Sequence, residues 1–313
     1  MNTVARLSVF AAGVLLLGAG AFAVGTVVDA GPAPAVANAG GPAPGPAPAT
    51  ADARSAGLSS TASGYTLLPL TPRLPADRPA GLAFRVTGPD GRTVTGFDVA
   101  REKRMHLVVV RRDTAGYQHL SPVMEPDGTW RAPTTPAGGG SYRVIADFVP
   151  TGGPPTVLGA DVSVAGGFSP VAPLPSRVGT APGGYEVRLD GDLVPGRYAE
   201  VALTVARDGR PVTDLQPHLG AYGDLVALRD GDLGYLRAHA QGGPGDGVTP
   251  AGPRMIFHAE VPTAGAYRLF LDFRHAGAVH TVQFTVPVSG PAGTQPGGPA
   301  PDAGHVEDEG THR

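Results

Sequence analysis

Cysteine is absent from the 313-residue chain. Its absence excludes disulfides, thiolate zinc sites, a cysteine nucleophile and lipidation on cysteine. Charged residues make up only 16% of the sequence, and the net charge of -3 at pH 7 provides no basic footprint for nucleic acid. We therefore expect no nucleic-acid partner, and we expect domains that are held together by packing alone.

Recognised catalytic motifs are also absent: the sequence contains no G-x-S-x-G, no H-E-x-x-H, no P-loop and no EF-hand pattern. Carboxylates that could in principle act as acid and base do occur, and two of them, Asp147 and Asp272, stand at matching strand positions close to Arg143 and Arg268. Surface ion pairs are the expected role of these residues. We expect no enzyme and no catalytic residues.

A long uncharged stretch lies near the N-terminus, from Leu7 to Val28, directly after Arg6. Its length suits a helix that spans a bilayer. A retained transmembrane anchor over residues 1–29 is favoured, and a cleavable signal peptide with small residues around Ala21 and Ala23 is the alternative. Because Arg6 precedes the stretch and no positive charge follows before Arg54, the rest of the chain is predicted to lie outside the cytoplasm, membrane-tethered or secreted.

Glycine and proline are abundant, with 47 glycines and 34 prolines, and they cluster in three segments. Residues 30–63 hold almost no large apolar side chains and predict a disordered Pro/Ala/Gly-rich spacer. Residues 289–313 form a similar tail that ends in the acidic "VEDEGTHR", and residues 167–183 read as a linker.

The sequence between the spacer and the tail repeats itself. "GYTLLPL" from Gly64 matches "GYEVRLD" from Gly184, and "HLVVVRRDTAGY" from His106 matches "DLVALRDGDLGY" from Asp224. "YRVIADF" from Tyr142 likewise matches "YRLFLDF" from Tyr267. The order of these segments is kept, so we predict two homologous domains over residues 64–166 and 184–288.

Each copy is a series of short β-type runs broken by turns, without a convincing amphipathic helix. About seven short strands in roughly 100 residues favour an immunoglobulin-like sandwich. Tyr142 and Tyr267 each follow a Gly-containing turn before the last strands, as the tyrosine corner of that fold does. The predicted fold class is therefore all-β, with two tandem immunoglobulin-like β-sandwiches after an N-terminal hydrophobic helix.

Histidines in the stretch "MHLVVVRRDTAGYQHLSP" raise the question of a metal site. Together with "HLGAYGDLVALRDGDLGYLRAHA", the stretch resembles a group of actinobacterial secreted or membrane-anchored proteins with tandem Ig-like domains and a histidine-containing strand-turn-strand pattern. That resemblance implies an association with heavy metals or copper, with His106 and His119 as the matching ligands. The chain departs from the pattern at Ser121, where the group has a second histidine, and in the second copy at Asp224 and Arg237.

Strand geometry narrows the candidates for metal ligands. If "DTAG" forms a four-residue hairpin loop, Val110 pairs with His119, which leaves His106 and His119 about 13 Å apart along the strand. The same register places Asp224 diagonal to His239, at roughly 7–8 Å between backbones. Asp224 and His239 are then the better remnant of a copper or zinc site, and surface histidines without a ligand are the alternative for His106 and His119.

These observations favour a non-enzymatic binding or structural protein of the cell envelope without a cofactor. Its expected partners are the membrane, through residues 1–29, and an unknown envelope protein or polymer. A copper- or zinc-handling envelope protein is the alternative, and an envelope enzyme is the less favoured one.

Overall fold

The computed structural model describes residues 56–290, and this part of the chain consists of strands and turns. The predicted anchor, most of the predicted spacer and residues 291–313 lie outside the described residues. Between residues 56 and 290 there is no helix of the length and apolar character that a membrane crossing requires.

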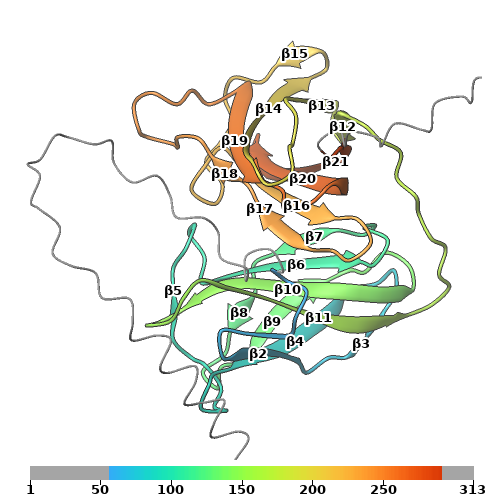
Figure 1. Cartoon of the computed structure of the whole chain (residues 1–313), viewed down its shortest axis with the longest axis vertical. Helices are drawn as coiled ribbons and strands as arrows, with labels where there is room; N and C mark the ends of the chain where they lie inside the picture. The colour runs from blue at the N-terminus through green and yellow to red at the C-terminus, as the bar shows by residue number, and fades with distance from the viewer. Residues whose placement is uncertain (1–55, 291–313) are drawn as a thin grey trace, which may run out of the picture. The chain divides into compact units, whose positions relative to one another are not determined.

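Eleven strands form the first sandwich (Figure 1). They are β1 (Thr61–Ala62), β2 (Tyr65–Pro69), β3 (Arg73–Pro75), β4 (Ala80–Thr87), β5 (Phe97–Asp98), β6 (Met105–Arg111), β7 (Gln118–Leu120), β8 (Val123–Met124), β9 (Trp130–Thr134), β10 (Gly140–Pro150) and β11 (Thr156–Ala165). One sheet has the order β1-β2-β4-β9-β8 and the other β3-β11-β10-β6-β7, with β5 paired to β10.

Ten strands form the second sandwich. They are β12 (Val178–Ala181), β13 (Tyr185–Asp190), β14 (Tyr198–Arg207), β15 (Arg210–Pro211), β16 (Gly223–Arg229), β17 (Tyr235–Arg237), β18 (His239–Ala240), β19 (Arg254–Glu260), β20 (Gly265–His275) and β21 (Ala278–Val288). Its sheets have the orders β12-β13-β14-β19-β18, with β15 on β14, and β17-β16-β20-β21.

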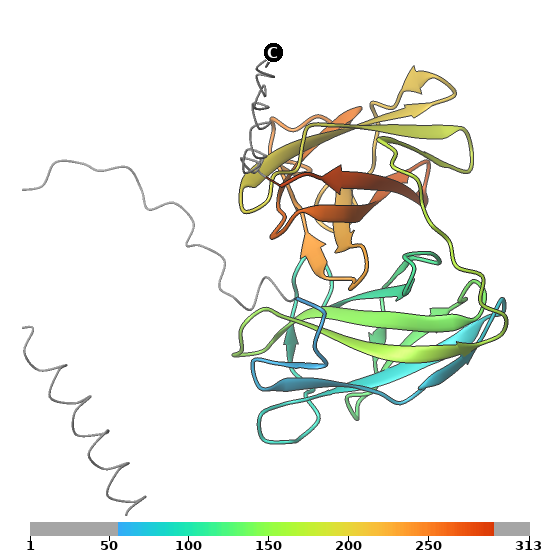
Figure 2. The same ribbon diagram turned by 45° about the vertical axis from the view of Figure 1, so that its right-hand side comes forward.

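This strand order is that of an immunoglobulin-like sandwich, as the sequence predicts. In each copy, strands that are distant in the chain pair within one sheet, such as β4 with β9 in the first and β14 with β19 in the second. The short β3 joins the sheet opposite β2 by pairing in parallel with β11, so the first strand segment is divided between the two sheets. Figure 2 shows the two sheets of each copy stacked face to face.

Separate apolar cores fill the two sandwiches. In the first, the single tryptophan, Trp130, packs edge-on against Phe97 and stacks on Phe84. In the second, Phe257 of one sheet and Phe284 of the other are both buried in the same cluster. Alternation of the side chains along β13, buried and exposed in turn, is typical of a strand with one face on a core.

The predicted tyrosine corners are confirmed. The Tyr142 hydroxyl donates to the carbonyl oxygen of Ala137 at 2.6 Å, and the Tyr267 hydroxyl donates to that of Thr263 at 3.0 Å. Both rings are fully buried. Each hydroxyl therefore fixes the turn before the strand that carries it.

Two boundaries differ from the expected ones. Strand β1 and the residues from Ala56 onward belong to the first sandwich, although the spacer was expected to continue to residue 63. Strand β12 pairs with β13, although its residues fall within the expected linker. Sequence composition misplaced both boundaries because Gly, Ser and Ala also occupy short edge strands that pack few side chains.

Candidate functional site

A third apolar cluster joins the two sandwiches, and we call this contact the joint. Both sandwiches belong to one compact unit of the chain, and the joint packs β6 and β10 of the first against β16, β17 and β20 of the second. Its buried members are Val108, Val110, Ile145, Val226, Leu228, Leu233, Tyr235 and Phe270. The Tyr117 ring stacks on Phe270, with 3.9 Å between the ring centroids and 5° between the planes.

The joint explains a pattern that one sandwich alone cannot explain. Every residue of β6 is buried, and six of the seven residues of β16 are buried. A strand at the surface of a sandwich alternates buried and exposed side chains, whereas a strand that is covered on both faces is apolar throughout. One face of β6 and of β16 therefore packs against the core of its own sandwich, and the other face packs in the joint.

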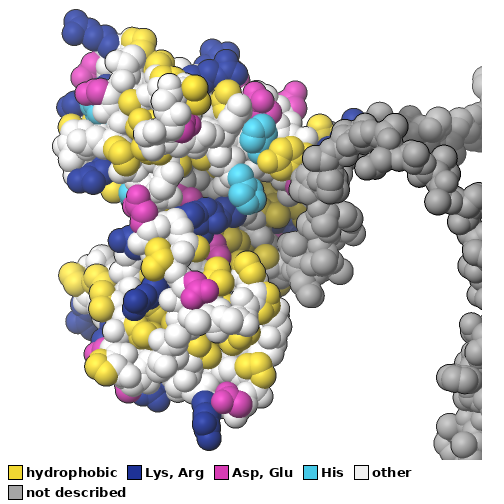
Figure 3. Space-filling model, turned by 90° about the vertical axis from the view of Figure 1, so that its left-hand side faces the viewer, with side chains coloured by type: hydrophobic (Ala, Val, Ile, Leu, Met, Phe, Trp, Pro, Cys, Tyr) yellow, Lys and Arg dark blue, Asp and Glu magenta, His cyan; other side chains and the backbone are white. Residues whose placement is uncertain are grey.

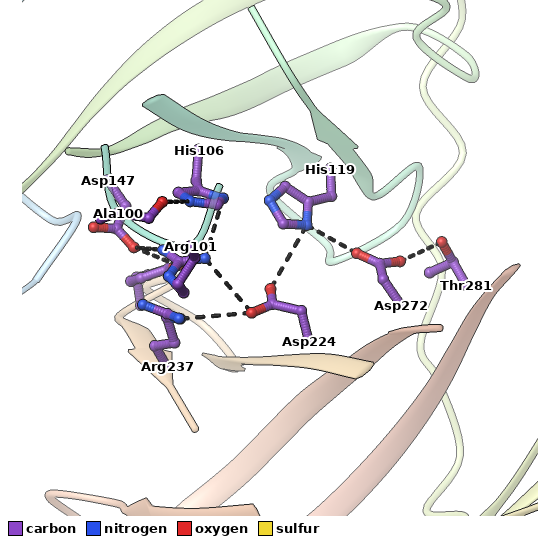
Figure 4. A network of polar contacts seen from close by, with 10 residues as sticks. Ala100, Arg101, His106, His119, Asp147, Asp224, Arg237, Asp272 and Thr281 are labelled. Carbon is purple, nitrogen blue, oxygen red and sulfur yellow. Dashed lines mark hydrogen bonds and ion pairs between the residues drawn. The ribbon is translucent and has the colours of Figure 1, made fainter. Parts of the chain in front are cut away.

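Charged and polar side chains gather beside the apolar part of the joint (Figure 4). We call this set the joint cluster, and its members come from both sandwiches: Arg101, His106, His119, Asp147, Asp224, Arg237 and Asp272. Arg101 lies in the loop before β6 and has a positive φ of 50°. That turn directs its side chain toward β10 and β16.

His106 is held neutral within the joint cluster. Arg101 donates from Nη1 to His106 Nδ1 at 3.1 Å, so the proton of the imidazole is on Nε2, which donates to the carbonyl oxygen of Ala100 at 3.0 Å. Burial and the positive charge of Arg101 lower the pKa of His106 to about 3. The ring is 3% exposed, so both of its nitrogens are used inside the protein.

His119 has the opposite protonation behaviour. Its Nδ1 donates to Asp272 Oδ2 at 2.9 Å and lies 3.8 Å from Asp224 Oδ2. Burial by itself lowers the pKa of His119, but the hydrogen bond to Asp272 and the charges of Asp272 and Asp224 outweigh it and raise the pKa above its ordinary value. The other oxygen of Asp272 accepts from the hydroxyl of Thr281 at 2.5 Å.

Arg101 and Arg237 form ion pairs with Asp147 and Asp224. Arg101 Nη2 bonds Asp147 Oδ2 at 2.6 Å, while Arg101 Nη1 and Arg237 Nε lie 3.5 and 3.6 Å from Asp224 Oδ1. With His119 protonated and His106 neutral, the joint cluster holds three positive and three negative side chains. Buried charges require such pairing, because an unpaired ion inside a protein costs several kcal/mol.

Equivalent positions of the two copies meet in the joint cluster. His106 corresponds to Asp224, His119 to Arg237, and Asp147 to Asp272 in the repeat. The apolar part of the joint is paired in the same way, with Tyr117 of one copy and Tyr235 of the other. Tyr235 donates to Asp147 at 3.2 Å, whereas Tyr117 has no hydrogen-bond partner in the described residues. The same face of each sandwich therefore covers the other.

The proximity of His106 and His119 corrects the predicted hairpin register. Val108 pairs with His119, two residues from the predicted partner, and the two imidazole centroids lie 5.7 Å apart. Arg111 bonds Ala115 across the turn, and Thr114 and Gly116 take positive φ values, so the loop is longer than "DTAG". His106 is buried and the His119 side chain is 8% exposed, so neither is the surface histidine of the alternative prediction.

The expected approach of Asp224 to His239 is wrong. Arg237, not His239, is the residue diagonal to Asp224, because Val226 pairs with Arg237. The chain then crosses to the other sheet at Ala238, and His239 pairs with His258 on β19. Within residues 56–290 no group of three or more His, Asp or Glu side chains could hold a metal ion. Copper or zinc binding by any of the four candidate residues stays a prediction.

The ion pairs also differ from the expected ones. Arg143 pairs with Asp161 at 2.7 Å rather than with Asp147, and Arg268 bonds the side chains of Gln283 and Thr285 rather than Asp272. Asp272 is 2% exposed and therefore no surface residue. Sequence proximity misled here because residues four apart in a strand share a face but stand about 13 Å from one another along it.

Arg101 and the Tyr117–Tyr235 pair were missed as joint residues. The continuous apolar run "HLVVV", which does not alternate, was a usable signal for a strand that is covered on both faces.

On the face drawn in Figure 3, basic, acidic and apolar side chains are intermixed, without a broad field of one sign.

Comparisons with solved structures find an adhesin, a surface layer protein and a tandem Ig module. The Escherichia coli adhesin FdeC is 16% identical over 74% of this chain and 65% of its own, with a TM-score of 0.26. Domains 4–9 of the surface layer protein SbsC are 12% identical over 73% and 31%, with a TM-score of 0.23. The Ig1-2 module of the Drosophila receptor tyrosine phosphatase DLAR is 8% identical over 72% and 98%, with a TM-score of 0.20. The chain thus spans less than two thirds of FdeC and of the SbsC fragment, and values this low carry no functional argument.

Sequence comparison gives the family. No curated protein matches the sequence. A family described as Domain of unknown function (DUF8832) matches twice, over residues 60–166 and residues 179–290. These matches include most of both sandwiches and more than half of the sequence. The chain therefore belongs to the DUF8832 family, with one copy of the domain in each sandwich.

Proposed function

We propose that the chain is a non-enzymatic protein of the cell envelope, membrane-tethered or secreted, whose two sandwiches act as one rigid binding or spacing module. The observation that carries this proposal is the joint, where the side chains best suited to chemistry bond one another. His106 uses both ring nitrogens inside the protein, and the carboxylate of Asp272 accepts from His119 and Thr281. A charge-balanced buried cluster favours one arrangement of two domains more than it adds stability.

The extracytoplasmic placement is supported by sequence features. The uncharged stretch from Leu7 to Val28 follows Arg6, and the Pro-rich residues after it suit a spacer between a membrane and a folded module. Protease added to protoplasts that carry the full chain with a C-terminal epitope tests this placement. We expect loss of the epitope without lysis, and degradation only after lysis would refute the placement.

Rigid coupling of the sandwiches is tested through unfolding by urea. Trp130 is the only tryptophan and lies in the first sandwich, so its fluorescence reports that sandwich, while far-UV circular dichroism reports both. In the full chain we expect the two transitions to coincide. Phe284→Ala, in the core of the second sandwich away from the joint, should then shift the Trp130 transition to lower urea, since Phe→Ala in a core costs about 3–5 kcal/mol.

The matched variant Phe270→Ala removes the same ring from the joint itself. It deletes the partner on which Tyr117 stacks, so we expect the two transitions to separate. If the urea midpoint of the Trp130 transition is unchanged by Phe284→Ala, the sandwiches unfold independently. That result would refute the rigid module.

A further inference from the structure

A pocket of about 480 Å³ opens in the second sandwich, outside the joint cluster. It lies where β16 begins, beside β18 and β19, and the chain from Gln241 to Pro250 forms one wall. Apolar side chains dominate the lining, and the residues that matter here are Tyr222, Ala240, Val248, Arg254, Met255 and Phe257. This volume is within the range of sites that hold small molecules.

The pocket continues the apolar core of the second sandwich. Met255 and Phe257 are members of that core, and Tyr222 and Ala240 pack against it. Val248, on the opposite wall, lines the pocket and is 85% exposed, so most of this apolar residue is in contact with water. An elongated apolar ligand would cover Val248 and extend the core outward, with a gain of roughly 25 cal/mol for each Å² of apolar surface removed from water.

The wall is a preformed loop. Asp246 accepts hydrogen bonds from the backbone N–H groups of Gly243, Val248 and Thr249 and from the Thr249 hydroxyl. These bonds hold the pKa of Asp246 far below its ordinary value, so the side chain stays an acceptor at neutral pH. The loop therefore needs little ordering when a ligand binds, and the carboxylate oxygens are directed to the loop itself.

Arg254 selects the polar end of the ligand. It lines the pocket at the start of β19, its side chain is exposed, and it makes no ion pair among residues 56–290. Asp246, the one acid among the lining residues, is bonded by the loop rather than by Arg254. An apolar pocket with one unpaired guanidinium at its wall complements a molecule with an apolar tail and one carboxylate.

We propose that this pocket binds a single-chain amphiphile with an anionic head, of the class of long-chain fatty acids. The tail lies against Ala240, Met255 and Phe257 and covers Val248 on the loop wall. The carboxylate pairs with Arg254. No covalent step is involved, so the proposed activity is reversible binding, and it does not depend on the rigidity of the joint.

The test is photolabelling of the full chain in phosphatidylcholine nanodiscs with a fatty acid that carries a diazirine in its tail. We expect the label on peptides that contain residues 221–223 and 240–257, as mapped by mass spectrometry. Arg254→Gln should reduce labelling of these peptides about tenfold, the loss expected for one charge-assisted hydrogen bond. The matched control Arg197→Gln removes an exposed arginine of the same sandwich and should leave the labelling unchanged.

Two further arms keep the result decisive. Ala240→Trp fills the pocket and should abolish the label, and unlabelled dodecanoate should compete better than dodecanol, which has the same tail without the charge. If Ala240→Trp fails to fold, the arginine pair and the competitors decide. Labelling elsewhere in the chain, or equal losses in Arg254→Gln and Arg197→Gln, would overturn the proposal.

Discussion

Asp272→Asn changes one atom in the joint cluster and probes its charge balance. The side chain is 2% exposed and accepts from His119 and Thr281, and asparagine can keep one of these two bonds. Removal of one partner of a buried ion pair costs about 3–5 kcal/mol. Because asparagine retains an acceptor, we expect a loss at the low end, about 3 kcal/mol in the free energy of unfolding at pH 6.

The loss should depend on pH in one direction. The pKa of His119 is raised in the folded chain, so the folded state holds the proton more tightly than the unfolded state does. The stabilisation by the His119–Asp272 pair is therefore fully present below about pH 6.5 and is lost as the pH rises through the folded pKa. In Asp272→Asn this contribution is absent, so the difference between the two proteins should shrink from pH 6 to pH 9.5.

Urea unfolding at both pH values, followed by circular dichroism, measures the difference. Asp161→Asn is the control, because Asp161 pairs with Arg112 and Arg143 and lies outside the joint cluster. Its effect should be equal at pH 6 and pH 9.5. An Asp272→Asn effect that is also equal at both values would refute a protonated His119 in the joint.

Four other outcomes are expected. The pKa of folded His106 is about 3, so the unfolded chain binds a proton at this residue before the folded chain does as the pH falls. The free energy of unfolding should therefore fall by about 1.4 kcal/mol per pH unit between pH 6 and 4 because of His106. His106→Gln should remove this fall, as measured from urea midpoints. Tyr142→Phe deletes the bond to Ala137 and should cost about 1 kcal/mol in urea unfolding followed by Trp130 fluorescence. Asp246→Ala should speed thermolysin cleavage before Val248, detected by mass spectrometry, because four loop hydrogen bonds disappear. Any Cu(II) or Zn(II) binding that is lost in His239→Ala should survive Asp224→Ala in calorimetric titrations, since the two residues lie on different sheets.

Local patterns predicted the fold well, because the fold depends on them. The repeat, the alternation along the strands and the tyrosine after each turn are all visible within short windows of sequence. They led to two all-β sandwiches with Tyr142 and Tyr267 at their corners, which the structure confirms. The predicted register of the hairpin after β6 is wrong by two residues, because Thr114 takes a positive φ that a non-glycine residue seldom adopts.

The site could be predicted only in part, since its residues meet across the joint. His106, His119 and Asp224 are predicted candidates, and they do gather, but Asp272 is far in sequence from His119 and Arg101 is far in sequence from Asp224. His239 was misplaced because a strand can change sheets within one residue, here Ala238, and nothing in the local composition marks the change. Contacts between domains depend on which faces pair, and a single sequence does not specify that pairing.

The correspondence between His106 and Asp224, and between His119 and Arg237, bears on how the chain arose by duplication. In a symmetric dimer of one ancestral domain, each interface residue occurs twice. A histidine at one position must therefore fit its surroundings in both copies. Once the copies are fused, mutation can act on each side separately. The joint then acquires complementary rather than identical groups, and the two halves lose the ability to replace one another.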